Sequence, residues 1–376
     1  MVNTFSFPTN ISFGPGALSQ LPAYLKEHSF KKPMVVTDEV VKELPFFKKI
    51  LDLLKKAGLD PLVFSDIHKN PVKTDVLKGK HAYGHERDCL VGLGGGSALD
   101  VARAIALSIN HDRDLFDYDE LVGGSSLITE PIPHFITVPT TSGTGSEVGR
   151  AAIISEDESK RKRILFHPSL MAKQVFADPE LTYDLPADIT AATGMDALTH
   201  HMEAFLARGY NPMCDGIALE GIQLIWNSLE RAVHRPDEHS RYQMMMASLM
   251  GAVAFQKGLG IVHSLSHPLS TLLDLHHGLA NAVNLSYGLE FNYAVCKDRF
   301  DKMAVQMNIR RGSEVLKVLK ELNHRLGLPL NLKQCGVEPI HIDDLSKLAA
   351  KDFCLPSNPR EASIADIKSI YQEALG

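Results

Sequence analysis

The first part of the chain alternates short apolar runs with helical patterns, and this alternation limits the fold more than any other feature. The apolar runs PMVVTD, DPLVFSD, DCLVGLGGG and PHFITVPTTSGTGSE lie at residues 33–38, 60–66, 88–96 and 133–147. Helical segments such as KKILDLLKKAG and SALDVARAIALSI lie between them. Because strands that alternate with helices form a parallel sheet covered on both faces, the sequence predicts an α/β domain with a Rossmann-like sheet.

The pattern changes near residue 185. Beyond Pro186 the strand-like runs disappear, and long helical patterns follow in ITAATGMDALTHHMEAFLA, GIALEGIQLIWNSLERAV, RYQMMMASLMGAVAFQKG and SEVLKVLKELNHRLG. A chain of 376 residues is too long for one ordinary core, so two domains are the natural expectation. We expect an α/β nucleotide-binding domain over residues 1–185 and an all-helical domain over residues 186–376.

Composition and charge exclude several classes of protein. The net charge of −6 and the lack of a basic stripe argue against nucleic-acid binding, and no apolar stretch approaches the length of a membrane span. The N-terminal residues lack the pattern of a signal peptide. Five cysteines without a CxxC pair indicate reduced thiols. We therefore expect a soluble, cytoplasmic protein with neither a nucleic-acid nor a membrane partner.

Two loops rich in small residues follow predicted strands. In GLGGGSALD, Gly94, Gly95 and Gly96 separate a strand from a helix that Ser97 is expected to cap, which leaves N–H groups for an anion. A tight turn between strand and helix is the alternative, since this sequence only loosely matches the dinucleotide fingerprint. The loop PTTSGTGSE at residues 139–147 adds hydroxyl groups after another strand, so together the loops indicate a nucleotide site.

Asp38 ends the first of these strands and favours one nicotinamide cofactor over the other. Its carboxylate could accept hydrogen bonds from a ribose diol, and it would repel a 2′-phosphate. The sequence therefore predicts NAD rather than NADP.

Acidic and histidine side chains of the second part form a candidate metal site. Asp196 and His200 stand four residues apart on one face of a predicted helix, a spacing that also suits a simple hydrogen bond along the helix. A cluster within residues 262–282 adds further imidazoles, those of His263, His267, His276 and His277. One carboxylate with three imidazoles, from Asp196, His200, His263 and His277, suits Fe²⁺ or Zn²⁺ and leaves positions for a substrate oxygen.

Four motifs occur here in the order found in the iron-containing (group III) alcohol dehydrogenases. These are GGGSALDVAR, PTTSGTGSE, ATGMDALTHHMEA and VHSLSHPL…HHGLANA, and the resemblance covers essentially the whole chain. It implies an N-terminal nucleotide-binding domain, a helical, dehydroquinate synthase-like C-terminal domain and a divalent metal in a cleft between them. It also implies NAD-dependent transfer of a hydride between a primary alcohol and its aldehyde, and a homodimer or higher homo-oligomer.

The resemblance also assigns residues. It implies metal ligands at Asp196, His200, His263 and His277, with His267 as a catalytic or positioning group. On the cofactor side it points to Asp38, Gly95, Gly96, Ser97, Asp100, Thr140, Thr141, Thr144 and Lys162. His276 stands where many members have proline, so its role stays open.

AFQKGLGIVHSLSHPL and LHHGLANAV resemble the branch of the family that acts on 4-hydroxybutyrate and succinic semialdehyde. Such a substrate needs a cation for its carboxylate, and Lys257 and Arg150 are the candidates. The alternatives are a general dehydrogenase of short-chain alcohols, diols or lactaldehyde, and, in a different class, a non-catalytic NAD- or metal-binding module.

Overall fold

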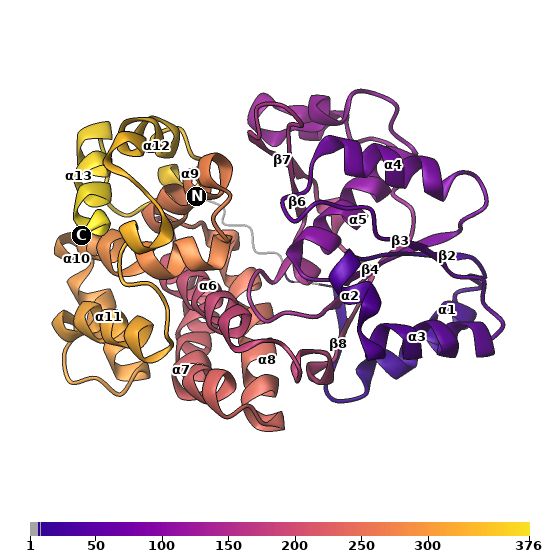
Figure 1. The fold of residues 1–376 in the computed structure, drawn as a ribbon, viewed down its shortest axis with the longest axis horizontal. Coiled ribbons are helices and arrows are strands. Elements are labelled where there is room, and N and C mark those ends of the chain that lie inside the picture. Colours follow the sequence, from indigo (N-terminus) through magenta and orange to yellow (C-terminus); the bar gives the residue numbers. More distant parts are fainter. Residues whose placement is uncertain (1–6, 8) are drawn as a thin grey trace. The chain divides into compact units, whose positions relative to one another are not determined.

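The computed structural model describes residue 7 and residues 9–376, which form two compact units. One unit runs to Thr141 and includes Gly145–Thr182; the other contains Tyr183–Gly376 and the short segment Ser142–Thr144. The indigo and purple part of Figure 1 carries the strands, and the orange and yellow part is helical. The predicted order of an α/β unit followed by a helical one is confirmed.

A parallel sheet forms the centre of the first unit. Among the described residues six strands pair in the order β1-β8-β5-β4-β2-β3, and every pair is parallel. Their bounds are β1 Asn10–Phe13, β2 Pro33–Val36, β3 Leu62–Phe64, β4 Cys89–Gly94, β5 Phe135–Pro139 and β8 Gln174–Ala177. An antiparallel hairpin, β6 Ala151–Ser155 and β7 Lys162–Phe166, lies outside this sheet. The sequence analysis does not predict β1, β8 or the hairpin.

Both faces of the sheet are covered, which explains the continuously apolar strands. Met34, Val36 and Leu90 belong to one buried cluster, and Val35 and Val91 to another. Since successive side chains of a strand point to opposite faces, each face has its own core. The helices of this unit are α1 Leu21–Glu27, α2 Glu39–Glu43, α3 Pro45–Lys56, α4 Lys73–Tyr83 and α5 Gly96–Ile109.

A buried arginine links α5 to the segments that follow β5. The Arg103 side chain is 0% exposed, and its guanidinium donates hydrogen bonds to the carbonyls of Leu170, Ala151 and Ser146. The buried carboxyl of Glu147 lies close enough for Arg103 to affect its pKa, yet one of its oxygens has no hydrogen-bond partner among the described residues. Burial raises the pKa of Glu147 to about 7, against the opposing charge of Arg103.

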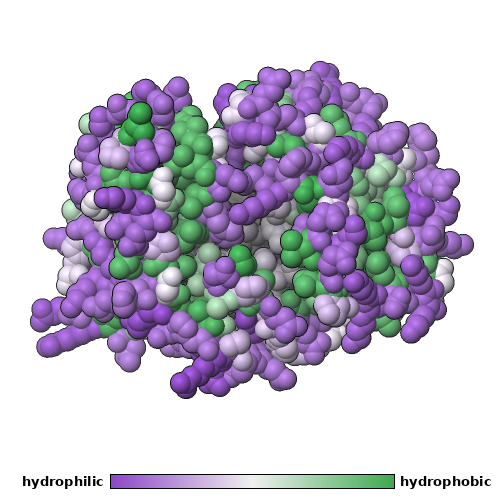
Figure 2. All heavy atoms as spheres, viewed as in Figure 1, coloured by the Kyte–Doolittle hydropathy of each residue, from purple (hydrophilic) through white to green (hydrophobic). Residues whose placement is uncertain are grey.

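The second unit is built around helix α6, Ala187–Leu206. Most of its residues from Thr190 onward are buried, so its sequence is apolar on most sides rather than on one stripe. The other helices are α7 Pro212–His234, α8 Glu238–Ala254, α9 Ile261–Leu273, α10 His277–Gln306, α11 Val315–Arg325, α12 Ile342–Ala349 and α13 Ile364–Leu375. Hydrophilic side chains cover much of the face drawn in Figure 2.

Among the residues that the structure describes, no single helix combines the length and the apolar composition that a bilayer crossing requires. The segments Glu238–Lys257 and Ile261–Leu273 have the required length and apolar composition only when taken together, and the chain bends by 108° between them.

A glycine allows α10 to begin directly against α6. A Cβ placed on Gly278 would collide with the carbonyl group of Ala192, and it would lie 3.4 Å from the Cβ of Asp196. Only a residue without a side chain permits this approach. Gly278 thereby brings the start of α10, including His277, beside Asp196.

The raised pKa of Glu147 predicts a pH-dependent stability of the first unit. A carboxyl whose pKa is higher in the folded protein stabilises it fully below its ordinary pKa of about 4.5, and this contribution is lost as the pH rises through about 7. Glu147→Gln keeps the shape and cannot ionise, so above pH 7 we expect it to unfold with a free energy about 3 kcal/mol higher than the natural protein. Urea denaturation at pH 5 and pH 8 measures the difference. Glu27→Gln, on the exposed side of α1, is the control, and equal behaviour of the two variants at pH 8 would contradict the role of Glu147.

Gly278→Ala should separate α10 from α6. We expect it to lower the free energy of unfolding by about 1–3 kcal/mol, because the added methyl group overlaps the α6 backbone. Gly216→Ala in α7 is the matched control, since its Cβ would meet no described atom within 4 Å. Alanine is the better helix former, so this control should be neutral or up to about 1 kcal/mol more stable. Thermal unfolding of both variants tests the contrast, and a shift of the same sign in both would exclude the steric explanation.

Candidate functional site

The carboxyl ends of β2, β4 and β5 form an edge suited to a nucleotide. The chain passes from β2 outward to β3 and then returns to place β4 and β5 on the other side of β2. The strand order therefore reverses between β2 and β4. In open α/β sheets, ligands bind outside the carboxyl ends of strands at such a reversal.

Several predicted cofactor residues gather at this edge. A Cβ on Gly94 would stand 3.5 Å from Asp38 Oδ2, and a Cβ on Gly95 would stand 3.5 Å from Thr141. The Thr140 N–H donates to the Gly94 carbonyl at 3.0 Å. Asp38 is held in place because its Oδ1 accepts hydrogen bonds from two N–H groups at the start of α2. The structure thus brings Asp38, Gly95, Thr140 and Thr141 together.

The start of α5 differs from the prediction that Ser97 caps this helix. Helix α5 begins at Gly96, with Gly95 in the capping position, and Ser97 Oγ instead donates to the Lys69 carbonyl at 2.7 Å. The helix begins earlier than its polar residue suggests, and a glycine offers no side-chain acceptor. The first N–H groups of α5 therefore have no side-chain cap, which is the arrangement that binds anions.

The remaining predicted cofactor residues are Asp100, Lys162 and Thr144. Asp100 is engaged internally, because it accepts hydrogen bonds from Ser146 Oγ at 2.6 Å and from the Ile153 N–H at 3.0 Å. Burial raises its pKa, which the charges of Arg103 and Lys162 oppose. Lys162 begins β7, and Thr144 belongs to the short segment that is part of the helical unit.

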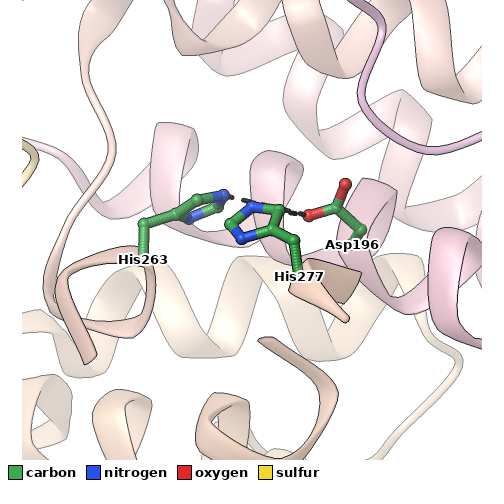
Figure 3. A group of neighbouring side chains, drawn as sticks. All are labelled: Asp196, His263 and His277. Carbon is green, nitrogen blue, oxygen red and sulfur yellow. Dashed lines mark ion pairs between the residues drawn. The ribbon is translucent and has the colours of Figure 1, made fainter. Parts of the chain in front are cut away.

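Three helices supply a group of converging metal-ligand atoms in the second unit (Figure 3). Asp196 comes from α6, His263 from α9, and His277 is the first residue of α10. Asp196 Oδ1 lies 4.0 Å from His263 Nε2 and 3.6 Å from His277 Nε2, and the ligand atoms of all three residues lie within 4.8 Å of one another. Asp196 and His263 are almost fully buried.

His200 faces the same carboxylate oxygen, with its Nε2 3.8 Å from Asp196 Oδ1. Its ring stacks on that of His263, with centroids 4.8 Å apart. Tetrahedral ligands at bond lengths near 2.1 Å stand about 3.4 Å apart, and the three imidazole Nε2 atoms lie 3.6–4.0 Å from Asp196 Oδ1. His200 does not belong to the group whose ligand atoms all lie within 4.8 Å of one another, which contains Asp196, His263 and His277. Burial lowers the pKa of His200 to about 4, so its ring is neutral and able to donate a lone pair.

The adjacent His201 points away from this group. Its Nε2 lies 2.8 Å from the Ala247 carbonyl, and its ring fills the space that a side chain on Gly221 would need. It is a core residue. His276 directly precedes α10, and the structure assigns it no role in the ligand group.

Glu203 orients His263. Its carboxylate accepts the Nδ1 proton of His263 at 2.6 Å and also the backbone N–H groups of Val262 and His263, at 2.7 and 3.2 Å. This pairing directs the lone pair of Nε2 toward Asp196. Burial disfavours a charged His263 ring, but the hydrogen bond and charge of Glu203 outweigh it and raise the pKa of His263.

His267 is paired in a similar way with Asp352. His267 Nδ1 lies 2.7 Å from Asp352 Oδ2, and the other oxygen of Asp352 accepts from Ser264 Oγ at 3.2 Å and the Cys354 N–H at 2.9 Å. The His267 ring stacks on those of His277 and Phe353, with centroids 5.2 and 5.0 Å away. His267 therefore lies beside the ligand group without pointing its Nδ1 at Asp196.

Lys257 does not have the free ammonium that a substrate carboxylate would need. Its side chain is 1% exposed, and its Nζ lies 2.5 Å from Asp215 Oδ1 and 3.0 Å from the Phe205 carbonyl. Arg299 also donates to both of these residues. Lys257 and Arg299 thus both donate to a carbonyl at the C-terminal end of α6, and Asp215 pairs with both cations. The other candidate, Arg150, lies over the ring of Phe166.

Sequence reasoning missed three residues of this site, of which two carry a recognisable signal. Glu203 continues the spacing of Asp196 and His200 by a further turn of α6, and Asn281 follows His277 by four residues. Asn281 Nδ2 lies 2.7 Å from Asp196 Oδ1. Asp352 is remote in the sequence from His267 and gives no local signal.

Comparison with known proteins agrees with this arrangement. Residues 8–179 match the model of the iron-containing alcohol dehydrogenases, and residues 190–375 match that of the C-terminal part of the Fe-containing alcohol dehydrogenase family. The chain is 40% identical to a 4-hydroxybutyrate dehydrogenase of Cupriavidus necator, over 98% of both chains.

Solved structures show the same relationship. A 1,3-propanediol oxidoreductase has a TM-score of 0.94 and 31% identity, covering 99% of this chain and 100% of that one. A sulfoacetaldehyde reductase of Bifidobacterium kashiwanohense, solved in complex with NAD⁺, has a TM-score of 0.89 and 27% identity, covering 100% of this chain and 99% of that one. The chain belongs to the iron-containing alcohol dehydrogenase family and is an oxidoreductase that acts on alcohols and aldehydes.

Proposed function

We propose that this oxidoreductase transfers a hydride between NAD(H) and the pair 4-hydroxybutyrate and succinic semialdehyde, with Fe²⁺ bound in the helical unit. The observation that carries the proposal is the convergence of three imidazole Nε2 atoms on Asp196 Oδ1. The substrate assignment rests on the 40% identity to the 4-hydroxybutyrate dehydrogenase.

Asp196, His200, His263 and His277 would hold the cation. Two observations support their fit. The set offers one carboxylate and three imidazole rings with lone pairs, and the Glu203 hydrogen bond fixes the orientation of His263. Nitrogen and oxygen ligands accept both Fe²⁺ and Zn²⁺, and we propose iron because of the family. The chemistry that such a cation supplies when bound is Lewis acidity, which promotes loss of an alcohol proton and polarises an aldehyde carbonyl.

His267 is proposed to transfer the hydroxyl proton of the alcohol. Because Asp352 binds its Nδ1, the second nitrogen, Nε2, is the one that can accept the hydroxyl proton of an alcohol, or donate a proton to the carbonyl oxygen as an aldehyde is reduced by hydride. Asp352 would also stabilise the ring while it carries the additional proton. His267 thus acts as a general base and acid beside the ligands, without being one of them.

NAD is proposed to bind at the carboxyl edge of the sheet. The uncapped start of α5 suits its pyrophosphate, Gly95 and Gly96 allow a close approach, and Asp38 suits the ribose diol. Thr140, Thr141 and Thr144 provide hydroxyl groups for hydrogen bonds to the cofactor. Ser97 and Asp100 contribute indirectly, because their hydrogen bonds hold neighbouring segments in place. The carboxylate of Asp38 disfavours NADP.

The cellular setting follows from the cysteines and the family. All five cysteines are free, as is usual in a reducing compartment, so we propose a cytoplasmic enzyme. The family resemblance further leads us to propose a homodimer or a higher homo-oligomer. A dehydrogenase of general short-chain alcohols, diols or lactaldehyde is the second candidate, because the metal site would serve it equally well.

The decisive experiment compares aldehydes at equal concentration. We expect protein reconstituted with Fe²⁺ to oxidise NADH with a kcat/KM at least tenfold higher for succinic semialdehyde than for lactaldehyde or propanal, which is about 1.4 kcal/mol of transition-state preference. Asp196→Asn should lose both metal and turnover. Equal rates for the three aldehydes would leave a general alcohol dehydrogenase. Lack of turnover with all three, despite bound metal and NAD, would favour a binding module.

Lys257→Met should change stability rather than substrate choice. We expect the free energy of unfolding to fall by about 1–3 kcal/mol, because Asp215 loses one of its two cations and the Phe205 carbonyl loses a donor. The kcat/KM values for succinic semialdehyde and propanal should keep their ratio. Lys317→Met, whose side chain is 80% exposed, is the control for loss of charge. A selective loss of activity on succinic semialdehyde would return Lys257 to the substrate site.

A further inference from the structure

Asn281 contacts the same three atoms that converge in the candidate metal site. Its side chain is fully buried, four residues beyond His277 on α10. Its Nδ2 lies 2.7 Å from Asp196 Oδ1, 3.3 Å from His263 Nε2 and 3.2 Å from His277 Nε2. The NH₂ group thus donates to Asp196 and lies within hydrogen-bond distance of both imidazole nitrogens, with two protons to share among the three atoms.

The orientation of the Asn281 amide follows from its neighbours. A carboxylate can only accept hydrogen bonds, so the NH₂ group and not the carbonyl must face Asp196. The His263 ring gives its Nδ1 proton to Glu203, which leaves an acceptor lone pair at Nε2. The carbonyl oxygen of Asn281 is then buried without a hydrogen-bond partner among the described residues. A buried amide whose carbonyl oxygen has no hydrogen-bond partner costs free energy, which indicates that the contact of its NH₂ group with the ligand atoms has a function.

A lone pair of the ligand group can serve an amide proton or a cation, but not both. Each neutral imidazole has one such lone pair, at the nitrogen that carries no proton. The Asn281 amide therefore has to give up its bonds to His263 and His277 when these rings bind a metal. We propose that Asn281 is a positioning residue that competes with the divalent cation for this ligand group and so lowers its affinity. This inference rests on the metal site proposed above.

Competition of this kind would affect both the equilibrium and the exchange of the metal. The amide compensates the buried carboxylate of Asp196 in the metal-free protein, so the ligand group stays assembled. It also returns to the ligand atoms as a cation departs, which assists release. Asn281 then keeps the site preformed and exchangeable.

The chain contains a matched control on the same helix. Asn284 is also 0% exposed, its amide donates to Ser266 Oγ at 3.1 Å, and its carbonyl oxygen likewise has no partner among the described residues. Asn284 has no hydrogen bond to the ligand atoms in the described structure. Truncation of Asn284 therefore reproduces the loss of a buried amide from α10 without touching the ligand group.

The test measures metal binding rather than turnover. Chelator-treated, full-length protein is titrated with Co²⁺ and with Zn²⁺ against a chromophoric chelator, and metal release into excess chelator is followed in time. We expect Asn281→Ala to bind each ion at least tenfold more tightly than the natural protein and to release it more slowly. Asn281→Ser, which cannot reach all three atoms, should shift in the same direction, while Asn284→Ala should bind like the natural protein.

Thermal unfolding supplies a second readout. If the amide stabilises the metal-free ligand group, Asn281→Ala lowers the unfolding temperature of the metal-free protein more than that of the metal-loaded protein, so the metal raises its Tm by more. Affinities of Asn281→Ala that equal those of Asn284→Ala, or fall below them, would overturn the competition. If the natural protein and every variant bound neither ion, the proposed metal site would fail and this inference with it.

Discussion

The buried carboxylate of Asp196 is the point at which helices α6, α9 and α10 of the helical unit come together. Its side chain is 2% exposed in the middle of α6, where an anion is costly unless donors or positive charge surround it. α9 and α10 both direct their N-terminal ends, which carry the positive side of the helix dipole, toward the acids of α6. Gly278 permits the close approach of α10. The candidate metal site thus also compensates a buried charge and allows two helices to pack closely.

Carboxylates behind the imidazoles give the rings different properties. Glu203 binds His263 and the start of α9 together, so the same acid fixes a helix and a ring orientation. Asp352 binds His267 and, through its other oxygen, Ser264 of the same helix. Burial dominates at His200 and lowers its pKa, against the charges of Asp196 and Glu203. Three histidines that look alike in the sequence are thereby separated into a neutral ring, His200, and two rings whose Nδ1 atoms are paired with different carboxylates, His263 and His267.

The sequence predicted what periodicity and local spacing can express. Four strands of the parallel sheet, the change to helices near residue 185 and the joining of Asp196 with the histidines all depend on patterns within one or two turns or strands. β1 and β8 pair with each other across more than a hundred and fifty residues, so no local pattern marks this pairing. Asp352 and His267 are likewise joined only by the fold. The apolar, glycine-rich residues around Lys257 in the sequence do not indicate its ion pair with Asp215, which lies on a different helix.

The acids around the site also limit how an anionic substrate can bind. Asp196, Glu203 and Asp352 place three carboxyl groups around the histidines, and the cations Lys257 and Arg299 are paired with Asp215. A second carboxylate close to the reacting carbon would be repelled. A substrate such as 4-hydroxybutyrate avoids this because two methylene groups separate its hydroxyl-bearing carbon from its carboxylate, whereas a 2-hydroxy acid carries the carboxylate directly on that carbon. Without the charge of a bound cation, the three carboxyl groups therefore disfavour an anionic group beside Asp196.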